Sequence, residues 1–406
     1  MSETTNDILE YPTPRDPAAP FLPSPELRAL HDAGIAISRV KTWDGHTPWL
    51  VLSHAAQRQL LGDPRVSANV HLERFPHPTP AMAATLPGRP KTIFDTDGAE
   101  HARFRRMLTN SFTRNRMEKI RPAIQKVTDE LIDKMLEGPK PTDLVTALAL
   151  PLPSLMICEL LGVPYADHDF FERHATIAVS RSSTPEQNHG STQELGGYIA
   201  RMIAEKMSRP EEDVFSDLGA RVKAGELDLP EATMLGVILL IAGHETSANM
   251  ITMGTTLLLQ NPDQLALLKG TEDPQVVAST VEELLRYLTI PHLLQRRIAI
   301  EDIEIAGVTI RAGEGIIAPL PAANFDPVAF PSPEKVDVLR EARHQHAFGW
   351  GPHQCIGQQL ARIELQVAYP TIFRRIPTLQ LAVPFESLRF KEDSLAYGIY
   401  ELPVTW

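Results

Sequence analysis

The sequence predicts a mainly α-helical protein with a smaller β portion, an α+β chain. The strongest helical signal covers residues 230–260, which start with an early proline and stop before Pro262. At about 1.5 Å per residue, this helix would be on the order of 45 Å long and could cross the whole molecule. The main β signal is an alternating segment, residues 298–317, which is interrupted by two Ala-Gly turns.

The N-terminal region predicts an extended lead-in followed by a hairpin. Residues 1–25 form this lead-in, because the chain from Tyr11 onward is rich in proline. The apolar runs 37–41 and 48–52 flank an Asp-Gly pair, which is typical of a β-hairpin.

The rest of the chain continues as helices with short β segments. A meander punctuated by prolines covers residues 319–333, and residues 379–404 indicate terminal hairpins. No internal repeat or low-complexity linker divides the 406 residues, so we expect a single domain over residues 1–406. Further helical patterns cover residues 53–61, 101–112, 117–136 and 153–161.

Composition and charge exclude several classes of protein. The formal net charge of -12 argues against a nucleic-acid partner, because phosphate binding needs a concentrated basic patch. Two cysteines leave no disulfide framework and indicate a reducing cytoplasm. Residues 1–10 do not read as a signal peptide, and the apolar stretches 235–242 and 144–164 are too short or too interrupted to span a bilayer. We therefore expect a cytoplasmic monomer without membrane contact.

The most informative segment is the cysteine loop, residues 348–357, which reads FGWGPHQCIG. A thiolate persists at neutral pH with a positive neighbour, backbone N–H donors or a helix N-terminus, and this loop can supply all three. Its glycines let the backbone fold tightly around the sulfur or let a flat cofactor approach. Cys158, in contrast, lies in an ordinary apolar helix and is predicted to be structural. The candidate metal ligand is Cys355, and the candidate cofactor contacts in the loop are Phe348, Gly349, His353 and Gly357.

The cysteine loop resembles the haem-binding loop of the cytochrome P-450 superfamily, the haem-thiolate monooxygenases, with its spacing intact. The order of elements is similar to the P-450 fold over nearly the whole chain. The resemblance therefore implies that fold, haem b as the cofactor and Cys355 as the axial ligand of the haem iron. The chain is also similar to the soluble actinobacterial subfamily that acts on macrolides, polyketides, sterols and xenobiotics.

A second part of the resemblance lies in the middle of the long helix, which reads LLIAGHETSAN. Polar groups inside an apolar helix are costly unless they are satisfied or functional. Gly243 can clear space for a ligand, and the Thr246 hydroxyl can bond back toward Ala242. In the family, a similar Gly-x-acid-Thr stretch activates oxygen over the haem. The resemblance implies that Thr246 holds bound oxygen, while Glu245, with help from His244, passes protons inward.

A third part of the resemblance is an acidic residue and an arginine three positions apart. Glu283 and Arg286 share one face of a predicted helix, although an isolated pair at this spacing adds little stability. The pair resembles the family's Glu-x-x-Arg, which binds a later arginine beneath the haem. Arg340 is our candidate for that third partner.

Haem carries propionates, so we expect basic side chains from other parts of the chain to converge on it. His101 and Arg105 lie one helical turn apart, and a similar His-x-x-x-Arg contacts propionates in the family. Arg297 resembles the arginine that does the same after the Glu-x-x-Arg helix. Its neighbour Arg296 is the alternative.

The activity that the resemblance implies depends on the axial ligand, because a thiolate opposite dioxygen favours O–O cleavage. We expect a monooxygenase that inserts one oxygen atom from O2 into a C–H bond of an apolar small molecule, by hydroxylation or sometimes epoxidation. Suitable substrates are a polyketide, a macrolide, a statin-like lactone or a sterol. One alternative is a nitric-oxide reductase of the same fold, which lacks the acid that Glu245 supplies. Another is a haem-based gas or ligand sensor, which needs an output domain that the sequence does not show.

Electrons must come from another protein, because the chain shows no flavin or iron–sulfur segment. The resemblance implies a ferredoxin and a ferredoxin reductase. A local basic patch could receive the ferredoxin, although each of its residues could equally belong to a solvated helix face. These residues are Arg103, Arg106, Arg114, Arg116 and Lys119.

The predicted substrate pocket is a roomy apolar cavity with few charges. Its expected walls are the long helix and residues 70–94, 177–197, 290–294 and 395–399.

Overall fold

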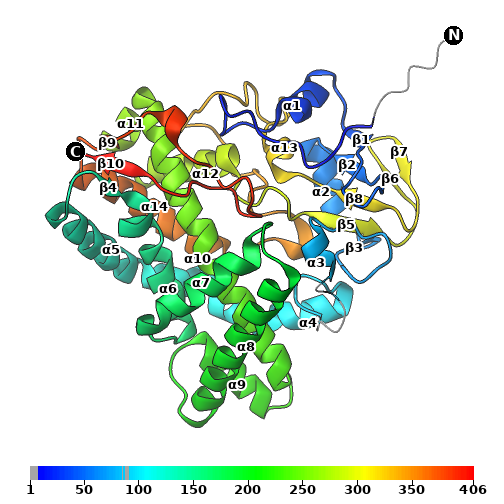
Figure 1. Ribbon diagram of the computed structural model, residues 1–406, viewed down its shortest axis with the longest axis horizontal. Helices are drawn as coiled ribbons and strands as arrows, with labels where there is room; N and C mark the ends of the chain where they lie inside the picture. The colour runs from blue at the N-terminus through cyan, green and yellow to red at the C-terminus, as the bar shows by residue number, and fades with distance from the viewer. Residues whose placement is uncertain (1–7, 85, 87–90) are drawn as a thin grey trace.

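The computed structural model describes residues 8–84, 86 and 91–406, and the fold is mainly helical with a smaller β portion, as predicted (Figure 1). The first residues of the predicted lead-in, 1–7, and part of the predicted pocket wall 70–94 lie outside the described residues. The α-helices are α1 (Pro25–Asp32), α2 (His54–Gly62), α3 (Pro80–Ala84), α4 (Gly98–Thr109), α5 (Arg114–Glu137), α6 (Pro151–Leu161), α7 (His168–Val179), α8 (Pro185–Ser208), α9 (Val214–Lys223), α10 (Leu229–Gln260), α11 (Pro262–Lys269), α12 (Pro274–Leu288), α13 (Leu320–Asn324) and α14 (Gln358–Arg375).

The strands are short and gather mainly at one side of the helical body (Figure 1). They are β1 (Ile37–Arg39), β2 (Trp49–Val51), β3 (Val66–Ser67), β4 (Thr142–Asp143), β5 (Arg296–Ala299), β6 (Ile303–Ile305), β7 (Val308–Ile310), β8 (Gly315–Ile317), β9 (Gln380–Leu381) and β10 (Pro403–Thr405).

Helix α10 is the central element, and its bounds agree closely with the predicted residues 230–260. Its start is a capping box, in which the Asp228 side chain accepts from the Glu231 N–H and the Glu231 side chain accepts from the Asp228 N–H. It packs against α6, α8, α12 and α14. The absence of a side chain at Gly254 lets Tyr369 approach α10, where its hydroxyl donates to the Met250 carbonyl at 2.5 Å.

Helix α10 also bears on the predicted absence of a membrane span. Among the described residues it is the one helix that is long and apolar enough to cross a bilayer. However, 67% of its most apolar window is buried inside the protein. Its apolar surface is therefore covered by neighbouring helices, as in the core helix of a globular protein.

The five-stranded sheet has the order β1-β2-β8-β5-β3. The predicted hairpin is confirmed, because β1 and β2 are antiparallel and pair Ile37 with Val51. The predicted alternating segment forms β5, the β6–β7 hairpin and β8. Strand β8 runs parallel to β2, a pairing between distant segments that the sequence did not predict. Next to it, β5 pairs Arg297 with Ile316, which places this arginine inside the sheet.

The predicted terminal hairpins are present in part. Strand β10 pairs with β9 but also with β4, which the sequence analysis did not identify. Between β9 and β10 lies the C-terminal turn, residues 390–399, closed by an antiparallel bridge between Phe390 and Ile399. Further bridges join Ser394 to Ser180 and Ala396 to Pro291. The turn therefore connects three parts of the chain that the sequence analysis assigned to the pocket wall.

A buried ion-pair network fastens α12 to the segment before the cysteine loop. Arg286 donates to Glu283 through Nε at 2.7 Å and Nη2 at 2.8 Å, and both side chains are fully buried. Arg340 Nε lies 3.2 Å from the same carboxylate. The Asp337 N–H also donates to Glu283, at 3.0 Å, and Arg286 donates to the Asn324 carbonyl at 2.9 Å. The structure thus brings together the three residues that the sequence grouped.

The network predicts that Glu283→Ala destabilises the protein strongly. The substitution leaves the Arg286 guanidinium buried without its carboxylate, and breaking a buried pair in this way costs about 3–5 kcal/mol. The exposed pair between Lys126 and Glu130 gives a matched control, because Glu130→Ala should cost no more than about 0.5 kcal/mol. Urea unfolding of the haem-loaded proteins measures both. Equal losses for the two variants would contradict a structural role for the network.

Candidate active site

The cysteine loop is held tightly against α2. Gly351 has a φ of +75°, and a Cβ at this position would lie 2.2 Å from the Leu61 carbonyl oxygen. Gly349 also has a left-handed φ, of +71°. The loop closes through a hydrogen bond from the Cys355 N–H to the Phe348 carbonyl at 2.9 Å. Side chains at these glycines would be strained, and at Gly351 one would also meet backbone.

The Cys355 sulfur lies at the start of α14, where free N–H groups point toward it. The residue is accessible to solvent, yet protein surrounds it closely enough that burial raises the pKa of its thiol. The N–H groups of Gly357 and Gln358, together with the charges of Arg105 and Arg362, oppose this rise without cancelling it. The predicted donors are therefore present, and a bound metal cation would add to the stabilisation of the thiolate.

Basic side chains converge near the loop and form what we call the basic cluster: His101, Arg105, Arg297 and His353. The rings of His101 and His353 lie 4.0 Å apart. Burial, together with the charges of His353 and Arg105, lowers the pKa of His101 to about 4. Burial also lowers the pKa of Arg297 to about 10. The cluster thus concentrates groups whose positive forms repel one another.

A single carboxylate is in contact with this cluster among the described residues. Asp97 Oδ1 lies 3.5 Å from His353 Nε2. Burial alone would raise the pKa of Asp97, but hydrogen bonds from His353 and Ser67 outweigh it and bring the pKa to about 2. Arg297 donates to the Arg296 carbonyl and to Gln295. The donor set therefore fits a buried anion, and the propionates of haem are such an anion.

The structure separates the two arginines between which the sequence left a choice. Arg296 donates to the carbonyls of Pro76 and Leu293, and its guanidinium lies over the Tyr11 ring. Arg297 faces the other way, and its charge acts on His101 and His353. Arg297 is the one that belongs to the basic cluster.

The middle of α10 presents an unpacked face. Ala242 is exposed and Thr246 is half-buried, although most of the helix around them is buried. The Thr246 hydroxyl donates to the Ala242 carbonyl at 2.9 Å, as the sequence analysis expected. Gly243 does not face this side, because a Cβ there would lie 2.7 Å from Ile157. Our expectation that Gly243 clears space for a ligand is therefore corrected, since it allows α10 to pack against α6.

Glu245 makes contacts that the sequence analysis did not foresee. Its carboxylate accepts from Lys391 Nζ at 2.6 Å and from Asn249 at 3.4 Å. Burial alone would raise the pKa of Glu245, but the charge of Lys391 and its hydrogen bond lower it below the usual value. His244 is fully buried, and its Nδ1 forms a hydrogen bond with the Leu240 carbonyl at 3.1 Å. Its effect on the pKa of Glu245 is electrostatic. No local pattern around Lys391, 146 residues away, marks it as a partner.

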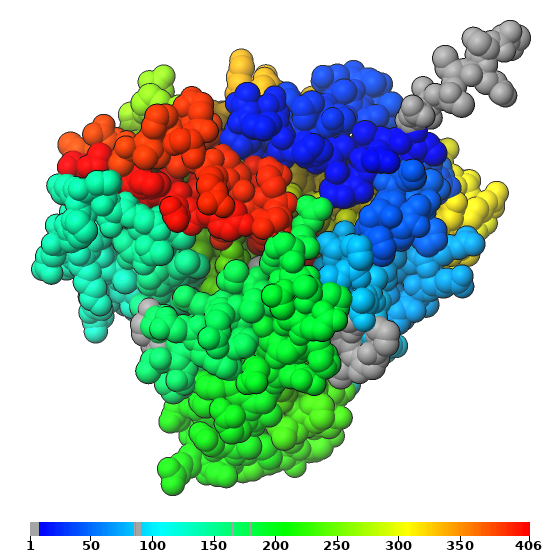
Figure 2. Space-filling model, in the orientation of Figure 1, coloured from blue at the N-terminus to red at the C-terminus, as the bar shows by residue number. Residues whose placement is uncertain are grey.

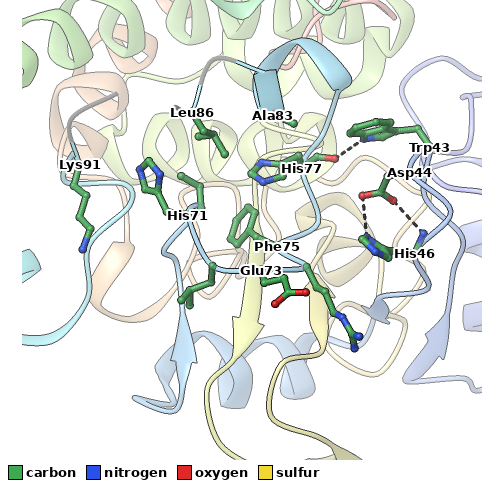
Figure 3. A pocket seen from close by; sticks show the side chains of 13 residues that line it. Trp43, Asp44, His46, His71, Glu73, Phe75, His77, Ala83, Leu86 and Lys91 are labelled. Atoms are coloured by element: carbon green, nitrogen blue, oxygen red, sulfur yellow. Dashed lines mark hydrogen bonds and ion pairs between the residues drawn. The ribbon is translucent and has the colours of Figure 1, made fainter. Parts of the chain in front are cut away.

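Part of the predicted pocket wall borders a surface hollow of about 650 Å³ (Figure 3). The hollow is lined by the turn of the β1–β2 hairpin and by the segment that follows β3. Asp44 contacts His46, and the Trp43 indole donates to the His77 carbonyl at 2.9 Å. Several charged side chains also face it, so this hollow differs from the apolar cavity that we expected. These side chains are Asp44, Glu73, Arg74 and Lys91.

A cysteine at a helix N-terminus, a converging cluster of basic side chains and a helix carrying an acid next to a threonine are together typical of a haem-dependent oxidoreductase. A family model described as cytochrome P-450 matches residues 272–379, which include α12, the ion-pair network and the cysteine loop.

Full-length relatives extend this match to the whole chain. Cytochrome P-450 CYP105Q4 of Mycobacterium marinum is 52% identical over 405 residues, covering 100% of this chain and 98% of the relative. Cytochrome P-450 GfsF of Streptomyces halstedii is 48% identical over 406 residues, with coverage of 100% and 98%. The crystal structure of GfsF matches with a TM-score of 0.92 over 98% of this chain and 100% of that one, at 49% identity. The 20-oxo-5-O-mycaminosyltylactone 23-monooxygenase of Streptomyces fradiae is 38% identical over 399 residues, or 98% of this chain and 92% of the relative.

The chain belongs to the cytochrome P-450 family. It is therefore a haem-dependent monooxygenase, which uses O2, a redox partner and a small-molecule substrate. The family resemblance, the P-450 fold and the haem cofactor that the sequence predicted are confirmed.

The geometry of the cysteine loop predicts that Gly351→Ala is more harmful than an equivalent change elsewhere. Gly45 has a similar φ, +80°, but nothing lies within 4 Å of a Cβ there. Both alanines carry about 1–2 kcal/mol of left-handed strain. Only Gly351→Ala adds the clash with the Leu61 carbonyl, which should cost about 1–3 kcal/mol more. Urea unfolding compares them, and equal destabilisation would show that the loop does not need this close approach.

Proposed function

We propose that Cys355 is the axial ligand of the haem iron in this monooxygenase. The observation that carries the proposal is the position of its sulfur, at the N-terminus of α14, with the Gly357 and Gln358 N–H groups and Arg105 acting on it. Donors of this kind stabilise a metal-bound thiolate and limit its basicity. When bound, haem supplies the iron at which dioxygen is reduced and its O–O bond is cleaved.

The residues that would hold the cofactor come from four separate segments. His101, Arg105, Arg297 and His353 would bind the propionates, because these hydrogen-bond donors converge and contact a single carboxylate among the described residues. The glycines of the cysteine loop let the backbone approach the flat macrocycle on the proximal side. The remaining contacts that we propose are Phe348, Gly349 and Gly357 in the loop and Ala242 on α10.

On the distal side, α10 would manage the protons that oxygen cleavage consumes. The Thr246 hydroxyl would be free to donate toward the cofactor side of α10 if it left the Ala242 carbonyl, to which it now donates. Glu245 would exchange protons with this hydroxyl, with help from its buried neighbour His244. The oxygen atom would be inserted into a C–H bond of the substrate to give an alcohol, or sometimes added across a C=C bond to give an epoxide.

The proposed substrate is an apolar small molecule such as a polyketide, a macrolide, a statin-like lactone or a sterol. The relative from Streptomyces fradiae supports this class, because its name gives 20-oxo-5-O-mycaminosyltylactone as the molecule oxidised. No observation favours the nitric-oxide reductase or the sensor, and the acid that the reductases lack is present as Glu245.

We propose that a ferredoxin and its reductase supply the electrons, and that the chain acts as a cytoplasmic monomer built as a single domain. The basic patch considered as a docking surface is smaller than the sequence suggested. Arg103 pairs with Glu231, and Arg116 lies 3.2 Å from Asp217. The exposed members of the patch are Arg106, Arg114 and Lys119.

The role of Cys355 predicts a specific change in the absorption spectrum. The reduced, carbon-monoxide-bound parent protein should show the strongly red-shifted Soret band of thiolate-ligated haem. Cys355→Ala should abolish that band, whereas Cys158→Ala should keep it, because Cys158 is a buried thiol with a pKa raised to about 12 by burial. An ordinary histidine-type band in the intact parent would refute the assignment.

The role of α10 predicts that its two polar residues affect different quantities. Thr246→Ala should keep haem content and substrate affinity but divert electrons into hydrogen peroxide, so that product per electron falls. Glu245→Gln should mainly slow the oxygen step, because it removes the proton exchange and leaves the hydroxyl. Both are measured as product, peroxide and oxygen consumed during turnover. Variants that couple electrons to product as well as the parent would exclude the proton-delivery role.

A further inference from the structure

The carboxylate of Glu245 is held by a residue of the C-terminal turn. Lys391 Nζ bonds to Glu245 Oε1 at 2.6 Å and to Asn249 Oδ1 at 3.0 Å. The side chains of Lys391 and Glu245 are only 12% and 6% exposed. Two further ionisable groups act on this carboxylate, His244 from α10 itself and Tyr400 from the end of the turn. Lys391 is the partner in direct contact, so it decides whether Glu245 stays ionised.

The C-terminal turn is shaped to approach α10 closely. At Gly398 a Cβ would lie 2.2 Å from Asn249 Oδ1, so only glycine fits without moving the turn. The Lys391 N–H donates to the Gly398 carbonyl at 2.9 Å, and Asn249 donates to the Ala396 carbonyl at 3.2 Å. Side-chain and backbone contacts thus hold Lys391 over Glu245.

The same turn is bonded to the α7–α8 connection, residues 180–184. The Arg181 N–H donates to the Asp393 carbonyl at 2.7 Å, and its guanidinium donates to the Glu392 carbonyl at 3.0 Å. Ser180 and Ser394 form an antiparallel bridge. The two segments meet on one face of the molecule (Figure 2). A movement of the connection therefore pulls on the residues directly after Lys391.

We propose that Lys391 is a positioning residue that holds Glu245 out of proton exchange while the α7–α8 connection is docked on the C-terminal turn, and releases it when the connection moves. The inference rests on the proposed role of Glu245 in proton delivery. A carboxylate in a buried ion pair is a poor proton carrier, because taking up a proton breaks the pair and leaves the ammonium uncompensated. Loosening the turn removes that obstacle.

The ion pair can be tested without turnover, by thermal unfolding of the haem-loaded protein. In Lys391→Met the unpaired carboxylate has a raised pKa, so the variant loses stability as pH rises, whereas the parent keeps its pair. The loss of melting temperature relative to the parent should be larger at pH 8 than at pH 5. The double variant with Glu245→Gln should show an equal loss at both pH values. Lys126→Met, which removes an exposed lysine, should show no such pH dependence.

The link to the α7–α8 connection is tested by the pH profile of product per electron. Lys391→Met and Arg181→Ala should both shift the profile to higher pH, and Lys391→Arg should restore the parent profile. Profiles of Lys391→Met and Arg181→Ala that match the parent, combined with a Glu245→Gln variant that is uncoupled, would overturn this inference alone. A Glu245→Gln variant that couples normally would instead remove the proposed proton delivery on which the inference rests.

Discussion

The Cys355 sulfur lies in a position where burial opposes its ionisation, and the rest of the site depends on how that opposition is overcome. N–H groups from the start of α14 and the charges of Arg105 and Arg362 favour the anion, yet the pKa of the thiol remains raised. A metal cation bound at the sulfur would stabilise the thiolate. The close packing of Gly351 on α2 restricts where the loop, and with it the sulfur, can lie.

The basic cluster and Glu245 also contain ionisable groups that burial affects. In both, a neighbouring charged partner helps to determine which protonation state is favoured. Among the described residues, Asp97 is the one carboxylate in contact with the basic cluster, so the cluster could bind a further anion. Glu245 has its partner already, in Lys391. The site therefore combines the basic cluster, which we propose binds the cofactor, with Glu245, which is already paired. The fully paired network around Glu283 fastens α12 to the segment before the cysteine loop.

Features marked by local signals, such as prolines at helix ends and turn residues, could be predicted from the sequence. Helix α10 was predicted almost to its bounds, because Pro230 marks its start and Pro262 follows its end. The hairpin of β1 and β2 follows from its Asp-Gly turn. The convergence of Glu283, Arg286 and Arg340 was expected from a family motif, whose spacing carries that information.

Contacts between distant segments could not be predicted in this way. The parallel pairing of β2 with β8 and the contact of Lys391 with Glu245 join residues that no local pattern relates. Gly243 shows a different limit, because a glycine in a helix can serve either a ligand or a neighbouring helix, and only the position of Ile157 decides between them. The thiol pKa is similar, since the sequence names the donors but does not show how strongly burial opposes them.

The central claim, that the Cys355 sulfur binds the haem iron, is tested most directly by X-ray absorption at the iron edge of the purified, haem-loaded protein. The account predicts one sulfur atom among the atoms bonded to iron in the parent and none in Cys355→Ala. An iron bonded only to nitrogen and oxygen in the parent, or a sulfur ligand that persists in Cys355→Ala, would contradict it.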